Sequence, residues 1–463
     1  MILFAIILIA TAFLVSTEYG WRGALLYTVA VGFLQDPIRK IAVGSTYYGG
    51  LAFACFLITF IALKNVNRYW YATYLFWTNQ KLITLLPMFY YLIGFQALNS
   101  FARIGDIRLS IIGMLFYTLP LLALWVGFHL GKNQLLLREF LTVYVVFCSL
   151  CAISVLLDAQ GVQNPLFNEV GKGLDITGIG EGNSGLWRTS EIAGWHLAAG
   201  ACFSFILGMT SKNSFNQNTW FFLTIGLTFL TTTTGRRKAL GIVIVFIALF
   251  LLYYSFSSQK SKIFRIVSSI FLVIILSVSS YGLIFNESSQ QDLGKYEERT
   301  ATLTLDESQN RFNSGIQRLM RGIEIAGPFG FGVGAGTNTG NTGISTSSLG
   351  QQSLGYVAEG GGGRIVAELG YLGAIFFLYI IIQLSLLYYR NFKLGLVEVP
   401  PDQFNILVGL LFFVIANAVS FFQAAQLYSD LFVLIILGIS FGCFLAVPIL
   451  ASQFNRTKNS LVR

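Results

Sequence analysis

The chain has 463 residues, of which 55% are hydrophobic and only 11% carry a charge, and its mean hydropathy is +0.68. A soluble globular protein carries about 25% charged residues, so this composition excludes a water-soluble globule. The formal net charge of +9 comes from basic residues that stand singly in short loops between apolar runs. That pattern sets membrane topology and is not typical of a nucleic-acid surface. The sequence predicts one polytopic membrane protein with no nucleic-acid partner.

Apolar runs long enough to cross a bilayer, about 20 residues each, recur from the first residue onward. The run MILFAIILIATAFLV has no basic segment and no small-residue cleavage site, so it predicts an uncleaved span rather than a signal sequence. The short pair of runs before Asp36 predicts a broken or re-entrant hairpin, which gives twelve or thirteen transmembrane helices in an all-α fold. The predicted ranges are 2–17, 20–34, 47–64, 81–99, 109–130, 137–157, 191–210, 219–234, 238–256, 263–285, 365–389, 404–424 and 429–450.

Basic residues in the C-terminal tail, Arg456, Lys458 and Arg463, place that tail in the cytoplasm. Counting back along the spans places two long hydrophilic segments, 158–190 and 286–364, outside. The chain then divides into four parts: N-terminal helices at 1–157, a central membrane region at 158–285 that begins with the first outer loop at 158–190, a large outer loop at 286–364, and three final helices with a cytoplasmic tail at 365–463.

The large outer loop is far longer than the usual connection of about 4–6 residues, and RFNSGIQRLMRGIEIAG within it predicts an amphipathic helix. Apolar residues recur every three to four positions, at Phe312, Ile316, Leu319 and Ile323. Cationic residues fall on an adjacent stripe, at Arg311, Arg318 and Arg321. Such a helix can lie on the outer membrane surface beside lipid phosphates.

A glycine-rich and Ser/Thr-rich stretch, FGFGVGAGTNTGNTGISTSS, follows the predicted end of this helix at Gly327 and Pro328. It has no apolar periodicity, which predicts a stretch that is mobile until something orders it. Its G-x-G-x-G pattern is no nucleotide site, because neither a preceding strand nor a βαβ unit surrounds it.

The segment TTTTGRRKAL places Arg236, Arg237 and Lys238 on the predicted outer side, where topology disfavours cations. Arginine suits a diphosphate because its planar donor fork meets phosphate oxygens in a bidentate way and keeps its proton. The alternative for any single arginine is that it extends to lipid headgroups. The candidates for diphosphate binding are Arg236, Arg237, Arg318, Arg321, Arg188 and Arg364.

Glu191, Trp195 and His196 open the span that follows the first outer loop, and their spacing places them on one helical surface. A carboxylate or an imidazole can remove a proton from a sugar hydroxyl, and a Trp face suits stacking on a pyranose. In the alternative interpretation, Trp195 anchors the helix at the membrane interface and Glu191 caps it. Glu191 is the first candidate for the catalytic base, with His196 in reserve, and Trp195 is the candidate for glycan stacking.

Arg364 and Glu368 stand four residues apart at the mouth of the next span, in EGGGGRIVAELGYLG. This spacing allows either catalysis and phosphate binding or a structural ion pair, so Glu368 is a further catalytic candidate. The five cysteines lie in apolar segments, and no His, Cys and carboxylate set has the spacing of a metal site. We therefore predict no metal and no cofactor.

Four segments, taken in chain order, resemble motifs of the O-antigen ligase and O-antigen polymerase superfamily of bacterial membrane enzymes. WRTSEIAGWHLA resembles the Arg-containing motif that opens a middle span, and TTTTGRRKALGIVIV resembles a Ser/Thr-Arg-Gly-like segment that opens another. RLMRGIEIAGPFGFGVGAG resembles the loop helix that runs into a Pro-x-Gly-x-Gly turn, and AELGYLGAIFF resembles the Glu-x-Gly-x-x-Gly entry to the next span. The resemblance covers residues 180–390.

The resemblance implies a metal-independent, membrane-embedded glycosyltransferase of the GT-C-like type in the bacterial cytoplasmic (inner) membrane. It would act at the periplasmic face on glycans linked to undecaprenyl diphosphate. Arg236 or Arg237, helped by Arg318 or Arg321, would meet the charge on the departing diphosphate. The expected partners are this lipid-linked glycan, membrane lipid, a chain-length regulator and other export proteins.

Ligases of this superfamily carry a His-Asn pair just before the Glu-x-Gly segment, whereas this chain reads EGGGGR there. Polymerisation of an O-antigen or exopolysaccharide repeat is therefore favoured over ligation to a lipopolysaccharide core or another acceptor. The alternative from another class is a lipid-linked oligosaccharide flippase or other transporter. The chain shows no internal repeat of the kind that many transporters carry, which favours the enzyme.

Overall fold

The computed structural model describes residues 2–42, 49–66, 80–169, 182–255, 305–336 and 357–461. All regular structure in these ranges is helical, and nine of the helices there are long and apolar enough to cross a membrane. The predicted all-α, multi-pass membrane architecture is confirmed at this level. The predicted span at 263–285 lies outside the described residues.

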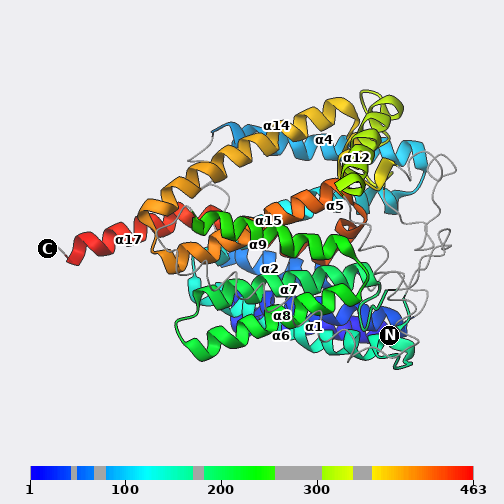
Figure 1. Ribbon diagram of the computed structural model, residues 1–463. Helices are drawn as coiled ribbons and strands as arrows, with labels where there is room; N and C mark the ends of the chain where they lie inside the picture. The colour runs from blue at the N-terminus through cyan, green and yellow to red at the C-terminus, as the bar shows by residue number, and fades with distance from the viewer. Residues whose placement is uncertain are drawn as a thin grey trace.

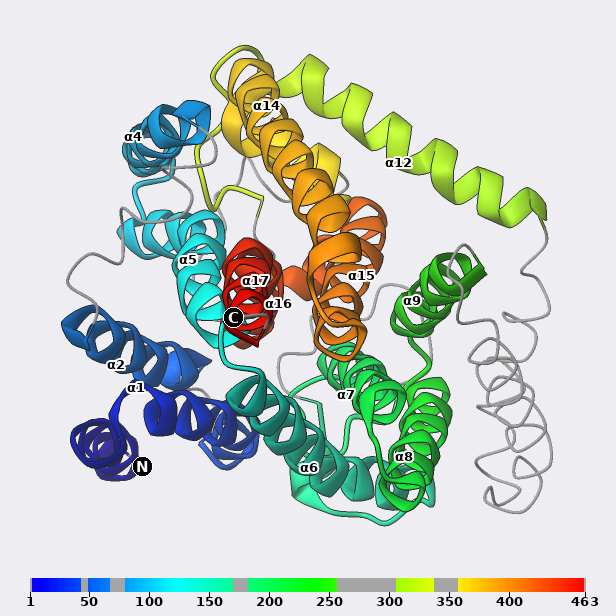
Figure 2. The same cartoon turned by 90° about the vertical axis from the view of Figure 1, so that its left-hand side faces the viewer.

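Most helices run side by side along one axis, and α12 lies across them, as Figure 1 and Figure 2 show from two directions. α17 projects from the opposite end of the bundle (Figure 1). The helices are α1 (Ile2–Ile41), α2 (Leu51–Val66), α4 (Gln80–Ile104), α5 (Ile107–Gly131), α6 (Gln134–Ala159), α7 (Ser190–Thr210), α8 (Ser214–Thr233), α9 (Arg237–Ser255), α12 (Leu305–Ala326), α14 (Gly361–Glu398), α15 (Pro401–Gln423), α16 (Leu431–Cys443) and α17 (Val447–Leu461), with short 3₁₀ turns η2 (Pro165–Phe167), η4 (Gln426–Ser429) and η5 (Phe444–Ala446).

Gly20 divides α1 into two spans. A continuous helix of 40 residues would be about 60 Å long, twice the thickness of the hydrocarbon core. Gly20 breaks it with a φ of 66°, and the Tyr27 hydroxyl donates to the Leu8 carbonyl at 3.2 Å across the two halves. The predicted hairpin is therefore present. Its second half continues past the predicted end at residue 34 to Ile41.

Other boundaries also differ from the predictions. α8 lies beside α7 but is not among the nine candidate spans, because Asn, Gln and Thr residues lower its hydropathy. α14 begins at Gly361 and runs to Glu398, longer than the predicted 365–389. The predicted final span at 429–450 is made of α16, η5 and the start of α17.

The predicted amphipathic helix of the large loop is α12, and it lies across one end of the bundle (Figure 2). The helix ends at Ala326, and the following Gly327 has the positive φ of 62° that is common after a helix. Gly315 and Gly322 face α15 and the start of α14, while Ile316, Met320 and Ile323 are exposed. An exposed apolar stripe on a helix with this orientation suits contact with the lipid surface.

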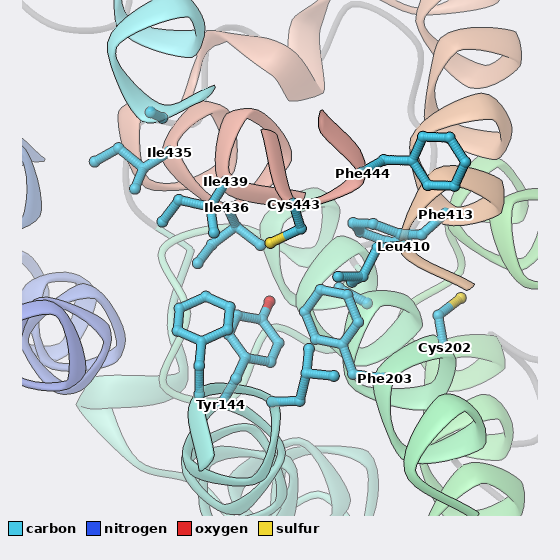
Figure 3. Close-up of a cluster of buried hydrophobic side chains, with 14 of the residues drawn as sticks. Tyr144, Cys202, Phe203, Leu410, Phe413, Ile435, Ile436, Ile439, Cys443 and Phe444 are labelled. Carbon is cyan, nitrogen blue, oxygen red and sulfur yellow. The ribbon is translucent and has the colours of Figure 1, made fainter. Parts of the chain in front are cut away.

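α7 is the central helix of the bundle, and nearly all of its residues are buried. Its neighbours are α6, α8, α9 and α15. Aromatic rings join it to two of them: the Phe203 ring centroid lies 5.0 Å from that of Tyr144 in α6 and 4.9 Å from that of Phe413 in α15, within the cluster of Figure 3. Because this packing holds α7 on several sides, its first turn is a fixed platform for the residues it carries.

Glycines allow α5 and α16 to approach closely. A Cβ added at Gly127 of α5 would clash with the Ile439 backbone, and one added at Gly442 of α16 would clash with the Leu124 carbonyl. Small residues at a helix crossing allow this kind of close backbone packing within a membrane.

We expect Gly127→Ala to lower the free energy of unfolding in detergent by about 1–3 kcal/mol, because the added methyl group overpacks this crossing. Gly241→Ala in α9 is the matched control, since an added Cβ there meets open space. It should leave stability unchanged or raise it by up to about 1 kcal/mol. Thermal unfolding of both variants tests this, and equal melting temperatures would contradict the tight crossing.

Candidate functional site

The candidate residues gather at the end of the bundle where α12 lies, which is called the α12 end below. The first turns of α7, α9 and α14 and the turn between α15 and α16 meet there. Direct contacts join these elements: Arg188 pairs with Asp430, and Arg364 donates to Ser429. The sequence-predicted residues thus lie at one end, although they come from distant parts of the chain.

The segment that leads into α7 is held by side chains from two other helices. The Asp158 carboxylate of α6 accepts hydrogen bonds from the backbone N–H groups of Ser184 (2.8 Å) and Gly185 (2.9 Å). The Lys40 ammonium of α1 donates to the Ser184 hydroxyl at 3.1 Å and to the Gly185 carbonyl at 2.6 Å. The entry to α7 is therefore fixed before the helix begins.

Thr189 and Glu169, rather than Glu191, cap the N-terminus of α7. The Thr189 hydroxyl accepts from Ile192 N–H at 3.4 Å, and the Glu169 carboxylate accepts from Ser190 N–H at 2.6 Å. These contacts satisfy N–H groups that the helix itself cannot. The Glu191 side chain is left to face the neighbouring α8–α9 turn.

Arg236 lies at that turn and contacts the start of α7. Its Nη1 is 3.3 Å from Glu191 Oε1, and its Nε donates to the Ser190 hydroxyl at 2.9 Å. Gly235, with a φ of 67°, makes the turn that positions it. The side chains of Arg236 and Glu191 are 40% and 30% exposed, so a ligand can reach both groups.

A second ion pair joins α12 to the residues just before α14. Arg318 Nη2 lies 2.6 Å from Glu359 Oε2. Lys238, in the first turn of α9, is within electrostatic reach of both ion pairs. The structure therefore brings together five charged residues, called the arginine cluster below: Glu191, Arg236, Lys238, Arg318 and Glu359.

The arginine cluster has three cations and two carboxylates, all at the same end of the bundle. This excess of positive charge suits a ligand with more than one negative charge, such as a diphosphate, which arginine forks can hold in a bidentate way. Glu359 was not among the predicted site residues, although it stands beside the glycine run that precedes Arg364.

The remaining loop arginines are placed differently. Arg237 begins α9 and is half-buried. Arg321 is exposed and pairs with Glu324 at 2.9 Å on its own helix. The Arg311 side chain lies outside the part of the chain whose side chains the structure describes.

Arg188 belongs to a separate, buried charge network. Its Nη2 lies 3.2 Å from Asp430 Oδ2, and its backbone N–H donates to Asp36 Oδ2 at 3.3 Å. Asp36 also lies 3.8 Å from Arg39, and Asp430 caps α16 by accepting from the first N–H groups of that helix. The network ties α1, α7 and α16 together, and its two carboxylates balance the two cations Arg39 and Arg188. Asp36 and Asp430 were not predicted as site residues: Asp430 lies inside the predicted span 429–450, where its charge was the available signal, whereas Asp36 lies just after the predicted span 20–34.

Arg364 and Glu368 form the structural ion pair that the sequence left as one alternative. Arg364 Nε is 3.2 Å from Glu368 Oε1, and both side chains are buried. Glu368 also accepts from the Tyr117 hydroxyl at 2.7 Å and from Gly336 N–H at 3.1 Å. With three donors and no exposure, the Glu368 carboxylate holds α5, α14 and Gly336 of the glycine-rich stretch together.

The start of the glycine-rich stretch, Phe329–Gly336, closes a break in α14, and the mobility of the stretch stays a prediction. α14 departs from helical geometry at Gly370, whose φ is 71°, so carbonyls before the break need other donors. Three of them are satisfied from outside the helix: Ala367 by Phe331 N–H (2.8 Å), Glu368 by Gly332 N–H (3.0 Å) and Leu369 by the Gln96 amide (3.3 Å). Residues 337–356 lie outside the described residues.

The alternation of glycines in this segment follows from backbone packing. Gly330, Gly332 and Gly334 all have a positive φ. A Cβ at these positions would clash with the backbone of Gly370, Ser100 and Leu109, respectively. The G-x-G-x-G pattern therefore allows close contact with α14, α4 and the start of α5.

Trp195 and His196 are buried in the bundle rather than open to a ligand. Trp195 is fully buried, and its indole N–H donates to Asn417 Oδ1 at 2.7 Å. His196 Nδ1 lies 2.7 Å from the Tyr144 hydroxyl, and the ring packs among aromatic side chains. Burial raises the pKa of nearby Tyr428, whose hydroxyl donates to Asn417. In this arrangement Trp195 presents no open face to a sugar.

Comparison of the sequence with models of known protein families and with curated proteins found no match. The resemblance to O-antigen ligases and polymerases therefore rests on the motifs in the sequence. The fold and the charged residues define the protein as a multi-pass helical membrane protein with a cationic cluster at one end.

We expect Asp430→Asn to destabilise the protein by about 3 kcal/mol, because it leaves Arg188 without its charge partner while an amide oxygen can still cap α16. The double variant Arg188→Met/Asp430→Asn should recover part of this loss. Denaturant or thermal unfolding measures both effects. A double variant less stable than Asp430→Asn would show that the pair does not account for the loss.

Proposed function

We propose that the protein is a polymerase of lipid-linked glycans in the bacterial inner membrane. It transfers a growing glycan from undecaprenyl diphosphate to the terminal sugar of a new lipid-linked repeat, at the outer face of the membrane. The single observation that carries this proposal is the arginine cluster, in which Arg236 pairs with the partly exposed Glu191 carboxylate, and Lys238 is within electrostatic reach of this pair and of Arg318.

In this proposal each charged residue has a role in one bond exchange. The bond between the donor sugar carbon and the diphosphate oxygen breaks, and the acceptor hydroxyl oxygen bonds to that carbon. Glu191 takes the proton of the hydroxyl. Arg236 and Arg318, with Lys238, hold the negative charge that stays on the diphosphate, and fixed cations aimed at developing charge stabilise a transition state.

Glu191 and Arg236 contact each other at 3.3 Å, so this ion pair has to open when the substrates bind. The donor diphosphate takes over Arg236, and the Glu191 carboxylate then turns to the acceptor hydroxyl. The fixed start of α7 keeps both groups close during this change, since Asp158, Lys40 and Thr189 hold the segment around them.

The distribution of charge supports an enzyme over a transporter. Among the described residues, both the arginine cluster and the Arg364–Glu368 pair lie at the α12 end. A transporter places its substrate site near the middle of the membrane, commonly at broken helices. A ligase stays the alternative within the same class, and it would differ by transferring the glycan to an acceptor that is not a new repeat.

We expect Arg236→Gln and Arg318→Gln to lower polymerisation of synthetic undecaprenyl-diphosphate repeats by about 10²-fold each, because each removes a donor to the departing diphosphate. The assay scores ladder formation by the purified protein. Arg321→Gln is the matched control, since that exposed side chain pairs within its own helix, and it should retain most turnover.

If the wild-type protein makes no ladder from its own repeat unit, polymerisation is wrong. Transfer of a glycan to an acceptor other than a new repeat, without a ladder, would instead indicate the ligase. Undiminished ladders from both arginine variants would remove the diphosphate role of the cluster and leave the polymerase proposal in place.

We expect Glu191→Gln to lower turnover by at least about 10²-fold while the lipid-linked donor still binds, because the amide cannot accept the proton of the hydroxyl. Comparison of turnover with the dissociation constant for undecaprenyl diphosphate separates these effects. Turnover close to that of the wild type would rule out Glu191 as the base.

A further inference from the structure

The Arg318–Glu359 pair is unequal in exposure. The Arg318 side chain is 19% exposed and the Glu359 side chain is 44% exposed, although their charged atoms are 2.6 Å apart. The carboxylate is therefore the more accessible partner. A ligand that reaches Arg318 meets this carboxylate and has to compete with it.

The backbone around Glu359 is fixed, whereas its side chain is the accessible part. The Glu359 carbonyl accepts a hydrogen bond from Ala425 N–H at 2.7 Å, at the start of the α15–α16 turn. Val357 is fully buried, and its side chain lies against Gly322 of α12 and Gly363 of α14. Rotation of the Glu359 side chain alone can release Arg318 without moving either helix.

Compensation of charge explains why a carboxylate stands at this position. Lys238 is within electrostatic reach of both Arg236 and Arg318, and like charges at short range repel. Glu359 and Glu191 each neutralise one arginine of this group. A diphosphate offers more negative charge than one carboxylate, and its oxygens fit an arginine fork in a bidentate way.

We infer that Glu359 is a built-in counter-ion that the diphosphate of the lipid-linked substrate displaces from Arg318. This inference rests on the proposed function, because it assigns a competitor to the same phosphate site. Arg318 exchanges one ion pair for another: it pairs with Glu359 in the empty protein and with phosphate oxygens in the complex. Glu359 is a positioning residue that makes no contact with the reacting atoms.

The test is the dissociation constant for undecaprenyl diphosphate, measured on the full-length protein in nanodiscs. Glu359→Gln should bind this lipid about 2–5-fold more tightly, which is the effect expected when one partly exposed ion pair no longer competes. Arg318→Gln should bind it more weakly than the wild type. In an Arg318→Gln background, Glu359→Gln should produce no further tightening.

Glu324→Gln is the matched control, because it removes one carboxylate from the exposed Arg321–Glu324 pair on the same helix. It should leave the dissociation constant unchanged. The inference would be overturned if Glu324→Gln and Glu359→Gln raised the affinity for the lipid equally, or if Glu359→Gln raised it in the Arg318→Gln background. Either result would show a general effect of charge.

An unchanged or weaker affinity of Glu359→Gln would also overturn the inference, while a wild-type protein that still binds the lipid and forms ladders would keep the proposed function. A wild-type protein that does not bind undecaprenyl diphosphate would overturn both.

Discussion

Backbone groups that are freed at a buried helix end must find partners inside the protein, because neither water nor lipid satisfies them there. This constraint shapes the whole α12 end. The carboxylates of Asp158, Glu169 and Asp430 accept from N–H groups before and within the first turns of α7 and α16. At the break in α14, the glycine-rich segment supplies two of the missing donors and Gln96 supplies the third. These polar groups satisfy the backbone, whereas Arg236, Glu191 and Glu359 are left partly exposed.

The same constraint separates the arginines into two groups. Arg188 and Arg364 are paired with buried carboxylates and hold helices together. Arg236 and Arg318 are paired with carboxylates that are partly exposed. In the sequence, all four were predicted only as cations on the outer side of the membrane. Exposure of the partner carboxylate distinguishes structural arginines from those that can exchange their partner for a ligand.

Hydrophobic runs predicted most of the helices, because the length of a span depends on the local sequence alone. The end of α12 at Gly327 was predictable because glycine acts locally, and the hairpin before Asp36 was predictable from the shortness of its two apolar runs. The site was predicted less well. The burial of Trp195 depends on its packing against α15, where Phe413 and Asn417 stand more than two hundred residues away in the sequence, and no periodicity within α7 predicts it.

The arginine cluster was predictable only as a set of candidates. Topology singled out Arg236 as a cation on the disfavoured side, and the helical stripe singled out Arg318. Their proximity depends on how α12 lies across the bundle, which requires packing between α12, α14 and α15. Glu359 was not predicted, because a single carboxylate beside a glycine run belongs to no periodic pattern and no motif.

The closure of the α14 break has a consequence for biogenesis. Gln96, which donates to the Phe329 and Leu369 carbonyls, is separated from them by 233 and 273 positions. Contacts between such distant positions form late, because the chain entropy lost in closing the loop comes before any gain. The early spans therefore enter the bilayer before the Gln96 amide has its carbonyl partners. The contact between α4 and the α14 break forms only after the translocation machinery has released α14.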